Sequence, residues 1–324
     1  MEKDSLPLVS VIVPTFNSAK TIEKCLSSLK EQSYKNIEVI VVDDGSNDET
    51  LASISNYNVT VVSLKENRGA PHAMNVGAEK ANGEYVFFLD ADAWAPDWLI
   101  EKAVNLFLED SSYSAVGGWY IPIGGNNLYS LYLRTNTFYR VHEPKKIELY
   151  EGNVDPQVYG CFLGFKRDVL SCEKFSENYK AIYDREYMAR LAHKGYKVLF
   201  VNDLFVYHPT PLTLSKTIQS VHVQSMWMGA VGKHSPIIIK YHLSLLFGVI
   251  TTLVLSLLIS PLILFLVFIA YTLAQLMHFL RLRQRFSITA KKTLQLIGLT
   301  YVLTIVTLFS FIIGLFMKPS SHWK

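Results

Sequence analysis

The chain has 324 residues, half of them hydrophobic, and a formal net charge of +3. This charge is too small to favour nucleic-acid binding, and the sequence contains neither a zinc-ligand spacing nor a Walker loop. The three cysteines, Cys25, Cys161 and Cys172, are scattered, which is typical of reduced thiols in a cytosolic domain. No long apolar core follows the first five residues, so we expect no secretory signal and a cytoplasmic N-terminal domain.

Short apolar runs, rich in β-branched and aromatic residues, lie at 9–13, 37–42, 59–64 and 85–89. Such runs are typical of strands that are buried on both faces of a parallel sheet. A helical pattern of apolar residues separates the first two runs, and residues 70–81 can form another helix before the fourth run. This alternation predicts right-handed βαβ units and an α/β fold for a first domain, residues 1–211.

The second and third segments of the chain are predicted to be helical. Residues 212–235 form an amphipathic linker helix, which lies either in a membrane interface or against the first domain. Residues 236–324 form a membrane domain, because a bilayer span needs about 20 apolar residues and this region contains several such lengths. A buried core hairpin of a soluble protein is the alternative.

Three transmembrane helices are expected in this membrane domain. The stretch 237–280 is too long for one span and is interrupted at Ser260-Pro261, so we expect spans near 237–259 and 261–280, and a third near 293–317. The loop before the third span carries five basic residues: Arg281, Arg283, Arg285, Lys291 and Lys292. The positive-inside rule places this loop in the cytoplasm, on the side of the first domain. The membrane helices also offer a surface for self-association.

Carboxylates follow the predicted strand at 37–42. Asp43 and Asp44 come directly before a glycine, at the strand end where α/β proteins bind their ligands. A carboxylate at this place can accept a hydrogen bond from a base N–H or a ribose hydroxyl. The alternative is an ordinary Asp-Asp-Gly-Ser turn.

A second carboxylate pair follows the strand at 85–89. Asp90 and Asp92 face the same way in an extended segment and can converge on Mg²⁺ or Mn²⁺. Such an ion would neutralise the charge on a diphosphate leaving group, whereas the alternative is a solvated acidic turn. Asn67 and Arg68 precede a predicted helix N-terminus, which favours an anion such as the diphosphate.

Taken together, these strand ends resemble the family 2 inverting glycosyltransferases of the GT-A fold. The resemblance covers about residues 8–210 and rests on Val9–Asn17, Val42–Ser46, Asn67–Gly69 and Asp90–Asp92, in family order and spacing. It implies a nucleotide-diphospho-sugar transferase fold, a Rossmann-like mixed sheet flanked by helices, and a UDP-, GDP- or dTDP-activated donor. It also implies a nucleotide-sugar site formed by Pro14, Thr15, Asn17, Asp43, Asp44, Asn67, Arg68 and Asp90, with Asp92 and Asp90 at the metal.

The resemblance also suggests a general base. The family's base lies in a Glu-Asp-x-Asp-Leu-x-x-Arg pattern near a helix start, and Tyr183–Arg190 is the similar run here. Asp184 takes the base position and would remove a proton from an acceptor hydroxyl. Tyr183 stands where the family pattern has its first glutamate, and Glu186 stands at the third acidic position of that pattern. Glu186 is therefore the second candidate for the general base. A helix cap is the structural alternative for Asp184.

A late histidine completes the expected metal ligands. His208 follows a strand-like run, and some GT-A enzymes have a histidine in a similar place as an extra metal ligand. An ordinary polar loop histidine is the alternative.

The sequence therefore predicts a membrane-anchored inverting glycosyltransferase that transfers a sugar to a lipid-linked glycan or another membrane acceptor. A polyprenyl-phosphate sugar synthase, similar to dolichyl-phosphate mannose synthase, is the second reading, but that subfamily has Asn-Glu where this chain has Asn17-Ser18. A processive polysaccharide synthase would carry a Gln-x-x-Arg-Trp motif, which the region 219–227 lacks. An inactive membrane scaffold would not need the carboxylates Asp44, Asp90, Asp92 and Asp184.

Overall fold

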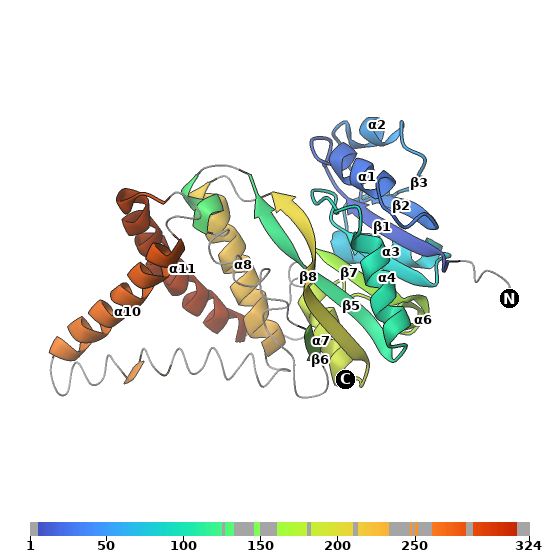
Figure 1. Ribbon diagram of the computed structural model, residues 1–324. Helices are drawn as coiled ribbons and strands as arrows, with labels where there is room; N and C mark the ends of the chain where they lie inside the picture. Colours follow the sequence, from blue (N-terminus) through green and yellow to red (C-terminus); the bar gives the residue numbers. More distant parts are fainter. Residues whose placement is uncertain are drawn as a thin grey trace. The chain divides into compact units, whose positions relative to one another are not determined.

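The computed structural model describes residues 6–124, 127–132, 146–149, 161–179, 183–209, 213–232, 247, 250–251, 261–282 and 288–315. The chain divides into two compact units. The first unit comprises Met1–Ile123, Tyr139–Pro209 and Ser320–Lys324, and the second comprises Gly124–Phe138 and Thr210–Pro319. The first unit holds the described sheet, and the second holds three long helices (Figure 1).

The strands of the first unit are β1 (Val9–Thr15), β2 (Ile37–Asp43), β3 (Thr60–Ser63), β4 (Tyr85–Leu89), β5 (Tyr113–Ile123), β6 (Lys146–Leu149), β7 (Phe162–Lys166) and β8 (Lys197–Pro209). They form one sheet in the order β3-β2-β1-β4-β7-β5-β8-β6 (Figure 1). β7 runs antiparallel to β4 and β5, and β6 runs antiparallel to β8, whereas the other neighbours are parallel. The predicted α/β fold with a mixed sheet is confirmed.

The helices of this unit are α1 (Ile22–Lys30), α2 (Thr50–Ile54), α3 (Ala70–Lys80), α4 (Leu99–Glu109), α6 (Arg167–Cys172) and α7 (Tyr183–His193). Two apolar cores lie on opposite faces of the sheet, because successive side chains of a strand alternate between faces. Val11 of β1 packs with residues of α1 and α4, and the next residue, Ile12, packs with residues of α3 and α7. Each such buried side chain contributes about 1.5–3 kcal/mol.

A glycine-rich passage is part of the central strand β5, which the sequence did not suggest. The parallel pairing of β5 with β8 shifts register between Gly117 and Trp119. At the shift, a Cβ added to Gly118 would lie 2.2 Å from the carbonyl oxygen of Leu204. Only glycine allows the two backbones to approach this closely, so the shift depends on Gly118.

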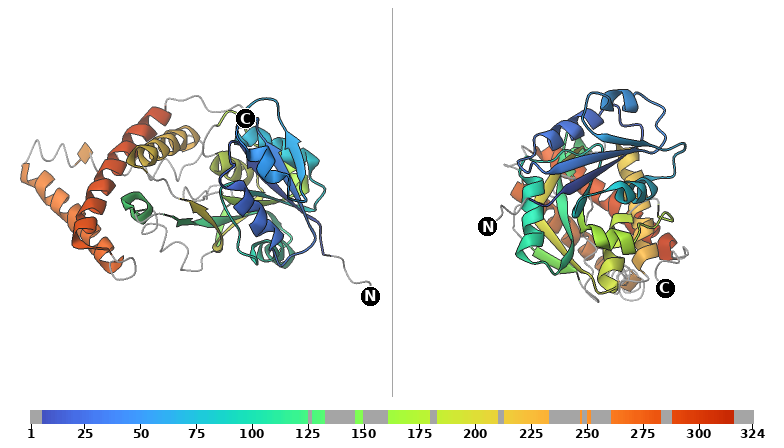
Figure 2. Two further views of the ribbon diagram at one scale, coloured as in Figure 1. Left: turned by 90° about the horizontal axis from the view of Figure 1, so that it is seen from above. Right: turned by 90° about the vertical axis from the view of Figure 1, so that its right-hand side faces the viewer.

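The second unit contains α8 (Leu214–Gly232), α10 (Pro261–Leu282) and α11 (Ala290–Leu315). α11 packs against both α8 and α10, and α10 and α11 can be followed in orange and red in Figure 2. Polar contacts join the helices: Thr272 Oγ1 lies 2.6 Å from Tyr301 Oη, and His222 Nδ1 lies 2.7 Å from Ser310 Oγ.

Two of these helices are long and apolar enough to cross a membrane, over Phe265–Leu282 and Ala290–Ile313. Exposed apolar side chains are frequent along α10, among them Phe265, Leu266, Phe268, Leu273 and Met277. The two helices overlap the ranges 261–280 and 293–317, where spans are predicted. The span predicted near 237–259 lies largely outside the described residues.

Candidate active site

The functional candidates gather at one edge of the sheet. Because β1, β2, β4 and β8 run in the same direction, their carboxyl ends lie at this edge, and the antiparallel strand β7 begins there. Thr15 ends β1, Asp43 ends β2, and His208 is the second-last residue of β8. Ligands of α/β proteins bind at this edge.

Asp44 forms hydrogen bonds that connect three loops. Its two carboxylate oxygens accept hydrogen bonds from the backbone N–H groups of Arg68, at 3.0 Å, and Gly69, at 2.6 Å. Its own N–H donates to the carbonyl of Thr15 at 2.8 Å. Asp44 is buried, so this carboxylate holds the turn before α3 against the ends of β1 and β2.

The neighbouring Asp43 shapes the turn after β2. Both of its carboxylate oxygens lie 3.3 Å from the N–H of Ser46. Gly45 has φ +74°, and a Cβ there would lie 3.0 Å from the backbone of Glu66, so the turn requires glycine. Asp43 therefore lies within a stable turn that supports Asp44.

Asn17 connects the loop after β1 to the loop after β2. It adopts a left-handed backbone with φ 50°, a conformation that asparagine tolerates better than most residues. Its N–H donates to Ser46 Oγ at 2.8 Å, and its side-chain oxygen accepts from the N–H of Asn47 at 2.9 Å. Pro14 and Thr15 precede it in β1.

Thr15 carries an unsatisfied hydroxyl. Its Oγ1 is buried and has no hydrogen-bond partner among the described residues. Buried polar groups in proteins nearly always have a partner, so this hydroxyl is available to a ligand at the strand end.

Arg68 and Asn67 lie in the turn before α3. The Arg68 guanidinium donates to Glu177 at 2.8 Å, and His72 Nδ1 lies 3.0 Å from the other oxygen of Glu177. This ion pair is partly exposed, with side-chain exposures of 49% for Arg68 and 38% for Glu177. An anionic ligand at the turn would compete with Glu177 for Arg68.

The carboxylates after β4 lie beside the end of β8. Trp94 and Tyr207 exchange two backbone hydrogen bonds, of 3.0 and 2.9 Å, which clamp the loop after β4 onto β8. As a result, His208 Nε2 lies 3.1 Å from Asp92 Oδ1. His208 Nδ1 donates to the carbonyl of Pro209 at 2.8 Å, since a carbonyl can only accept.

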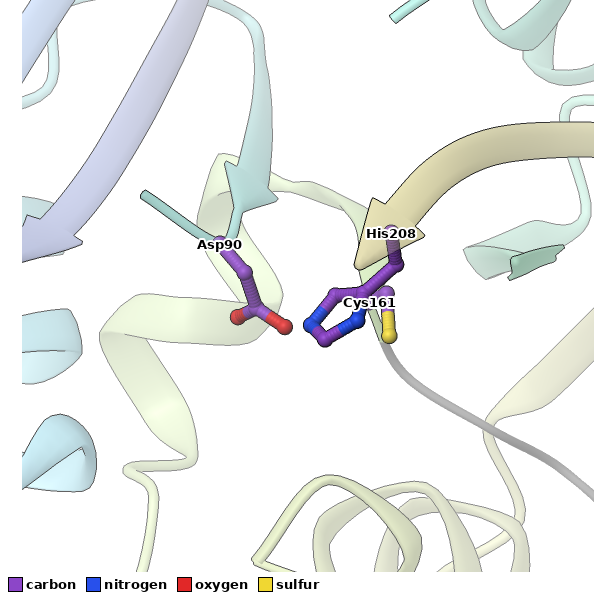
Figure 3. Close-up of side chains that lie close together, drawn as sticks. All are labelled: Asp90, Cys161 and His208. Atoms are coloured by element: carbon purple, nitrogen blue, oxygen red, sulfur yellow. The ribbon is translucent and has the colours of Figure 1, made fainter. Parts of the chain in front are cut away.

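Cys161 joins this group, which the sequence did not indicate. Strand β7 pairs antiparallel with β4, and Phe162 lies opposite Leu89, so Cys161 lies beside Asp90. One ligand atom each of Asp90, Cys161 and His208 lies within 4.8 Å of the others (Figure 3). A second thiol, Cys25 Sγ, donates to the Asp90 carbonyl at 3.6 Å. The local sequence around Cys161 carries no signal for this position, because only the strand pairing produces it.

Burial and mutual charge shift the pKa values of these groups. Burial raises the pKa of Asp90 to about 7, and the charge of Asp92 adds to the shift. Burial would lower the pKa of His208, but the hydrogen bond to Asp92 and the charges of both carboxylates raise it to about 9. Burial would raise the pKa of Asp92, yet the hydrogen bond and charge of His208 lower it overall.

The donor set fits a divalent cation. The two carboxylates supply oxygen ligands of the kind that Mg²⁺ and Mn²⁺ prefer, and the imidazole nitrogen is a ligand that Mn²⁺ accepts more readily than Mg²⁺. Burial, and then the charge of Asp92, disfavour the ionised form of Asp90, and a cation bound beside these carboxylates would favour it.

The two candidate bases lie in different surroundings on α7. Asp184 is partly exposed in the first turn, and its charge contributes to the raised pKa of Asp90 and of Cys161. Glu186 is fully buried and pairs with Arg190 Nε at 2.8 Å. Arg190 also binds Glu173 at 2.9 Å, so Glu186 belongs to a buried ion network.

Comparison with known proteins places the chain in a family. Residues 10–173 match the family described as Glycosyl transferase family 2, and the chain belongs to it. The putative teichuronic acid biosynthesis glycosyltransferase TuaG of Bacillus subtilis is 40% identical over 119 residues, which are 35% of this chain and 47% of TuaG. The chain thus spans about half the length of this curated relative.

Two solved structures share the fold. The mannosyltransferase PcManGT of Pyrobaculum calidifontis, in complex with GDP-Man and Mn²⁺, has a TM-score of 0.58 and 21% identity, covering 96% of this chain and 86% of that one. S. aureus TarS 1-349, in complex with UDP-GlcNAc, has a TM-score of 0.53 and 22% identity, covering 70% and 66%. These likenesses agree with the GT-A fold that the sheet order and flanking helices define.

Proposed function

We propose that this chain is a membrane-anchored inverting glycosyltransferase that moves a sugar from a nucleotide-diphosphate donor to a hydroxyl of a lipid-linked glycan or other membrane acceptor. The observation that carries the proposal is the placement of two groups at one sheet edge. The Asp44 loops form a polar cradle, and Asp90, Asp92 and His208 place two carboxylates and an imidazole side by side. A nucleotide and its metal-bound diphosphate need this combination.

The nucleotide would lie against the loops after β1 and β2. The free hydroxyl of Thr15 can donate to the donor, and Pro14, Asn17 and Asp44 would line the same surface. Asp43 keeps the turn in place, and Asn67 and Arg68 lie before α3, where an anion is favoured. A UDP, GDP or dTDP sugar is the expected class, in line with the donors bound by TarS and PcManGT.

Asp92, with Asp90 and His208, would hold Mg²⁺ or Mn²⁺. When bound, the ion neutralises charge on the leaving diphosphate. His208 is oriented for this role by its hydrogen bond to the Pro209 carbonyl, which leaves Nε2 facing the carboxylates.

Asp184 would act as the general base. It is partly exposed and lies near enough to Asp90 to affect its pKa. Glu186 is unsuited to this role because its carboxylate is buried and paired with Arg190. A base on the acceptor side, opposite the leaving diphosphate, gives inversion at the anomeric carbon.

The membrane anchoring is proposed from α10 and α11. Both are long and apolar enough to span a bilayer, and α10 exposes many apolar side chains. We infer a multi-pass protein whose first unit faces the cytoplasm, with an acceptor presented at the membrane. Reporter fusions between α10 and α11 and beyond α11 should report opposite sides, and reporters on one side would refute this topology.

A donor panel tests the proposed activity. The full chain in detergent is incubated with UDP, GDP and dTDP sugars, a membrane lipid extract and Mn²⁺, and sugar transfer and donor binding are measured separately. Transfer of one sugar that is lost in Asp92→Asn would support the proposal. If no donor binds, the proposal is wrong, and transfer to a polyprenyl phosphate alone would replace the glycan acceptor by a lipid phosphate.

A further inference from the structure

We propose that Asp90, Cys161 and His208 form a binding site for a thiophilic divalent cation, Zn²⁺, which displaces the hard cations Mg²⁺ and Mn²⁺. The three side chains come from the ends of three strands that meet at one sheet edge (Figure 3). Each contributes a different ligand type: a carboxylate oxygen, a thiol sulfur and an imidazole nitrogen.

The spacing suits a small tetrahedral ion. All three ligand atoms lie within 4.8 Å of one another. Around tetrahedral zinc, with bonds of about 2.0–2.3 Å, neighbouring ligand atoms lie roughly 3.5 Å apart. A modest inward movement of the side chains therefore reaches zinc geometry, and a fourth position stays open for water.

The backbone under these ligands is held in place. The antiparallel pairing of Phe162 with Leu89 fixes Cys161 beside Asp90, and the Trp94–Tyr207 bridge fixes the loop after β4 against β8. His208 Nδ1 donates to the Pro209 carbonyl at 2.8 Å, which leaves Nε2 as its ligand atom. Zinc-binding histidines commonly have such a partner, which orients the ring.

The ligand types decide which ion is favoured. Mg²⁺ prefers six oxygen ligands and gains little from sulfur or nitrogen, whereas Zn²⁺ binds thiolate and imidazole strongly. Without Cys161 the same place would offer only carboxylates and one imidazole. The thiol is therefore the feature that shifts the preference toward Zn²⁺, although the sequence has no zinc-ligand spacing.

Binding of Zn²⁺ has a predicted consequence that rests on the proposed function. Zn²⁺ would occupy Asp90 and His208 and separate His208 from Asp92, with which it now forms a 3.1 Å contact. Ligands needed for the donor's Mg²⁺ or Mn²⁺ would be lost, so Zn²⁺ should inhibit transfer. The binding itself is independent of any catalytic activity.

Cobalt provides a direct probe of the thiol ligand. The metal-stripped full chain in detergent is titrated with Co²⁺, and the near-ultraviolet sulfur-to-cobalt charge-transfer band is recorded. We expect a band in the wild type and in Cys172→Ser, an exposed cysteine that serves as the matched control, and its displacement by Zn²⁺. Cys161→Ser should abolish the band and weaken Zn²⁺ binding by more than about tenfold.

A band that persists in Cys161→Ser, or no band in the wild type, would overturn the proposal. Alkylation of the wild-type chain removes any dependence on the folding of that variant. Zn²⁺ should slow iodoacetamide labelling of Cys161, read by mass spectrometry, and leave Cys172 unaffected. Equal labelling of Cys161 with and without Zn²⁺ would contradict the site, whereas failure of the donor panel alone would contradict only the proposed function.

Discussion

Two parts of the sheet edge are built in different ways. The donor loops, residues 14–17, 43–46 and 67–69, are held by side chains that accept from backbone N–H groups, as Asp44 does from Arg68 and Gly69. In the metal corner, formed by Asp90, Asp92, Cys161 and His208, side chains face one another. Asp92 contacts His208 at 3.1 Å, and Cys161 lies beside Asp90.

The donor loops therefore contribute mainly a fixed shape to the site, and the metal corner contributes mainly ionisable groups. Carboxylates in the donor loops have their lone pairs occupied by fixed backbone donors, so they define a cradle that changes little when a ligand binds. In the metal corner, burial and then the charge of Asp92 raise the pKa of Asp90 to about 7, whereas His208 lowers the pKa of Asp92. Substitutions in the corner should therefore affect chemistry, and substitutions in the loops should affect stability and donor affinity.

The largest effect is expected for Asp92→Asn. Loss of the principal metal ligand should reduce transfer by roughly 10³-fold, because a catalytic metal contributes several kcal/mol and each 1.36 kcal/mol is tenfold in rate. The turnover number at saturating Mn²⁺ is the measurement, with the exposed Asp97→Asn as matched control. Full turnover in Asp92→Asn, and in wild type with EDTA, would show that the corner holds no catalytic metal.

Asp184→Asn should reduce the rate of sugar transfer to a hydroxyl acceptor almost as strongly. General-base help is commonly worth about 10²–10⁴ in rate, and asparagine cannot take the proton. A polyprenyl phosphate is already ionised, so transfer to it should fall much less. Donor affinity should stay unchanged, because the proposed mechanism places Asp184 on the acceptor side.

The matched variant on the same helix is Glu186→Gln. It breaks a buried ion pair with Arg190, so it should lower the free energy of unfolding by about 3–5 kcal/mol, measured by urea denaturation. If Glu186→Gln instead abolishes transfer at full stability while Asp184→Asn remains active, the base assignment must be exchanged.

In the donor loops, Asp44→Asn should act on stability and donor binding. One of two partly buried backbone N–H groups loses its acceptor, which should cost about 1–3 kcal/mol. Since about 1.4 kcal/mol corresponds to tenfold in affinity, we expect donor Kd to rise by around tenfold or more. Calorimetry with a UDP or GDP sugar checks this value. An unchanged Kd and unchanged stability would mean that Asp44 does not shape the cradle.

The smallest expected effect is the dependence of folding stability on pH in the metal-free protein. His208 has a folded pKa of about 9, so its stabilisation is complete below about 6.5 and is lost as pH rises through 9. Asp90, with a raised pKa of about 7, also makes the folded state less stable as pH rises from about 4 to 7.

With chelator present, Tm should therefore fall between pH 6 and 9. In a domain of this size, each 1 kcal/mol lost from the free energy of unfolding lowers Tm by about 2–4 °C. Thermal unfolding followed by circular dichroism measures the shift. His208→Gln should remove most of the fall between pH 6.5 and 9, and an identical pH profile in the variant would contradict the pairing of His208 with Asp92.

Much of the first unit could be predicted from sequence. Buried parallel strands need continuous apolar runs, so residues 9–13, 37–42 and 85–89 could be assigned to strands that the structure confirms as β1, β2 and β4. Carboxylates directly after such strands lie at the ligand-binding edge whatever the rest of the fold, which is why Asp44 and Asp90 could be chosen as candidates. The apolar helices of the second unit could be predicted from the length of their apolar stretches alone.

Only the tertiary structure decided which distant residues meet. Cys161 lies beside Asp90 because β7 lies antiparallel between β4 and β5. No periodicity in the local sequence indicates that pairing. His208 reaches Asp92 through the Trp94–Tyr207 bridge, and Glu186 turns into the core while Asp184 remains partly exposed. Sequence patterns report the burial and direction of a strand, whereas a site assembled from several strands depends on their order and register, which arise only when the whole sheet packs.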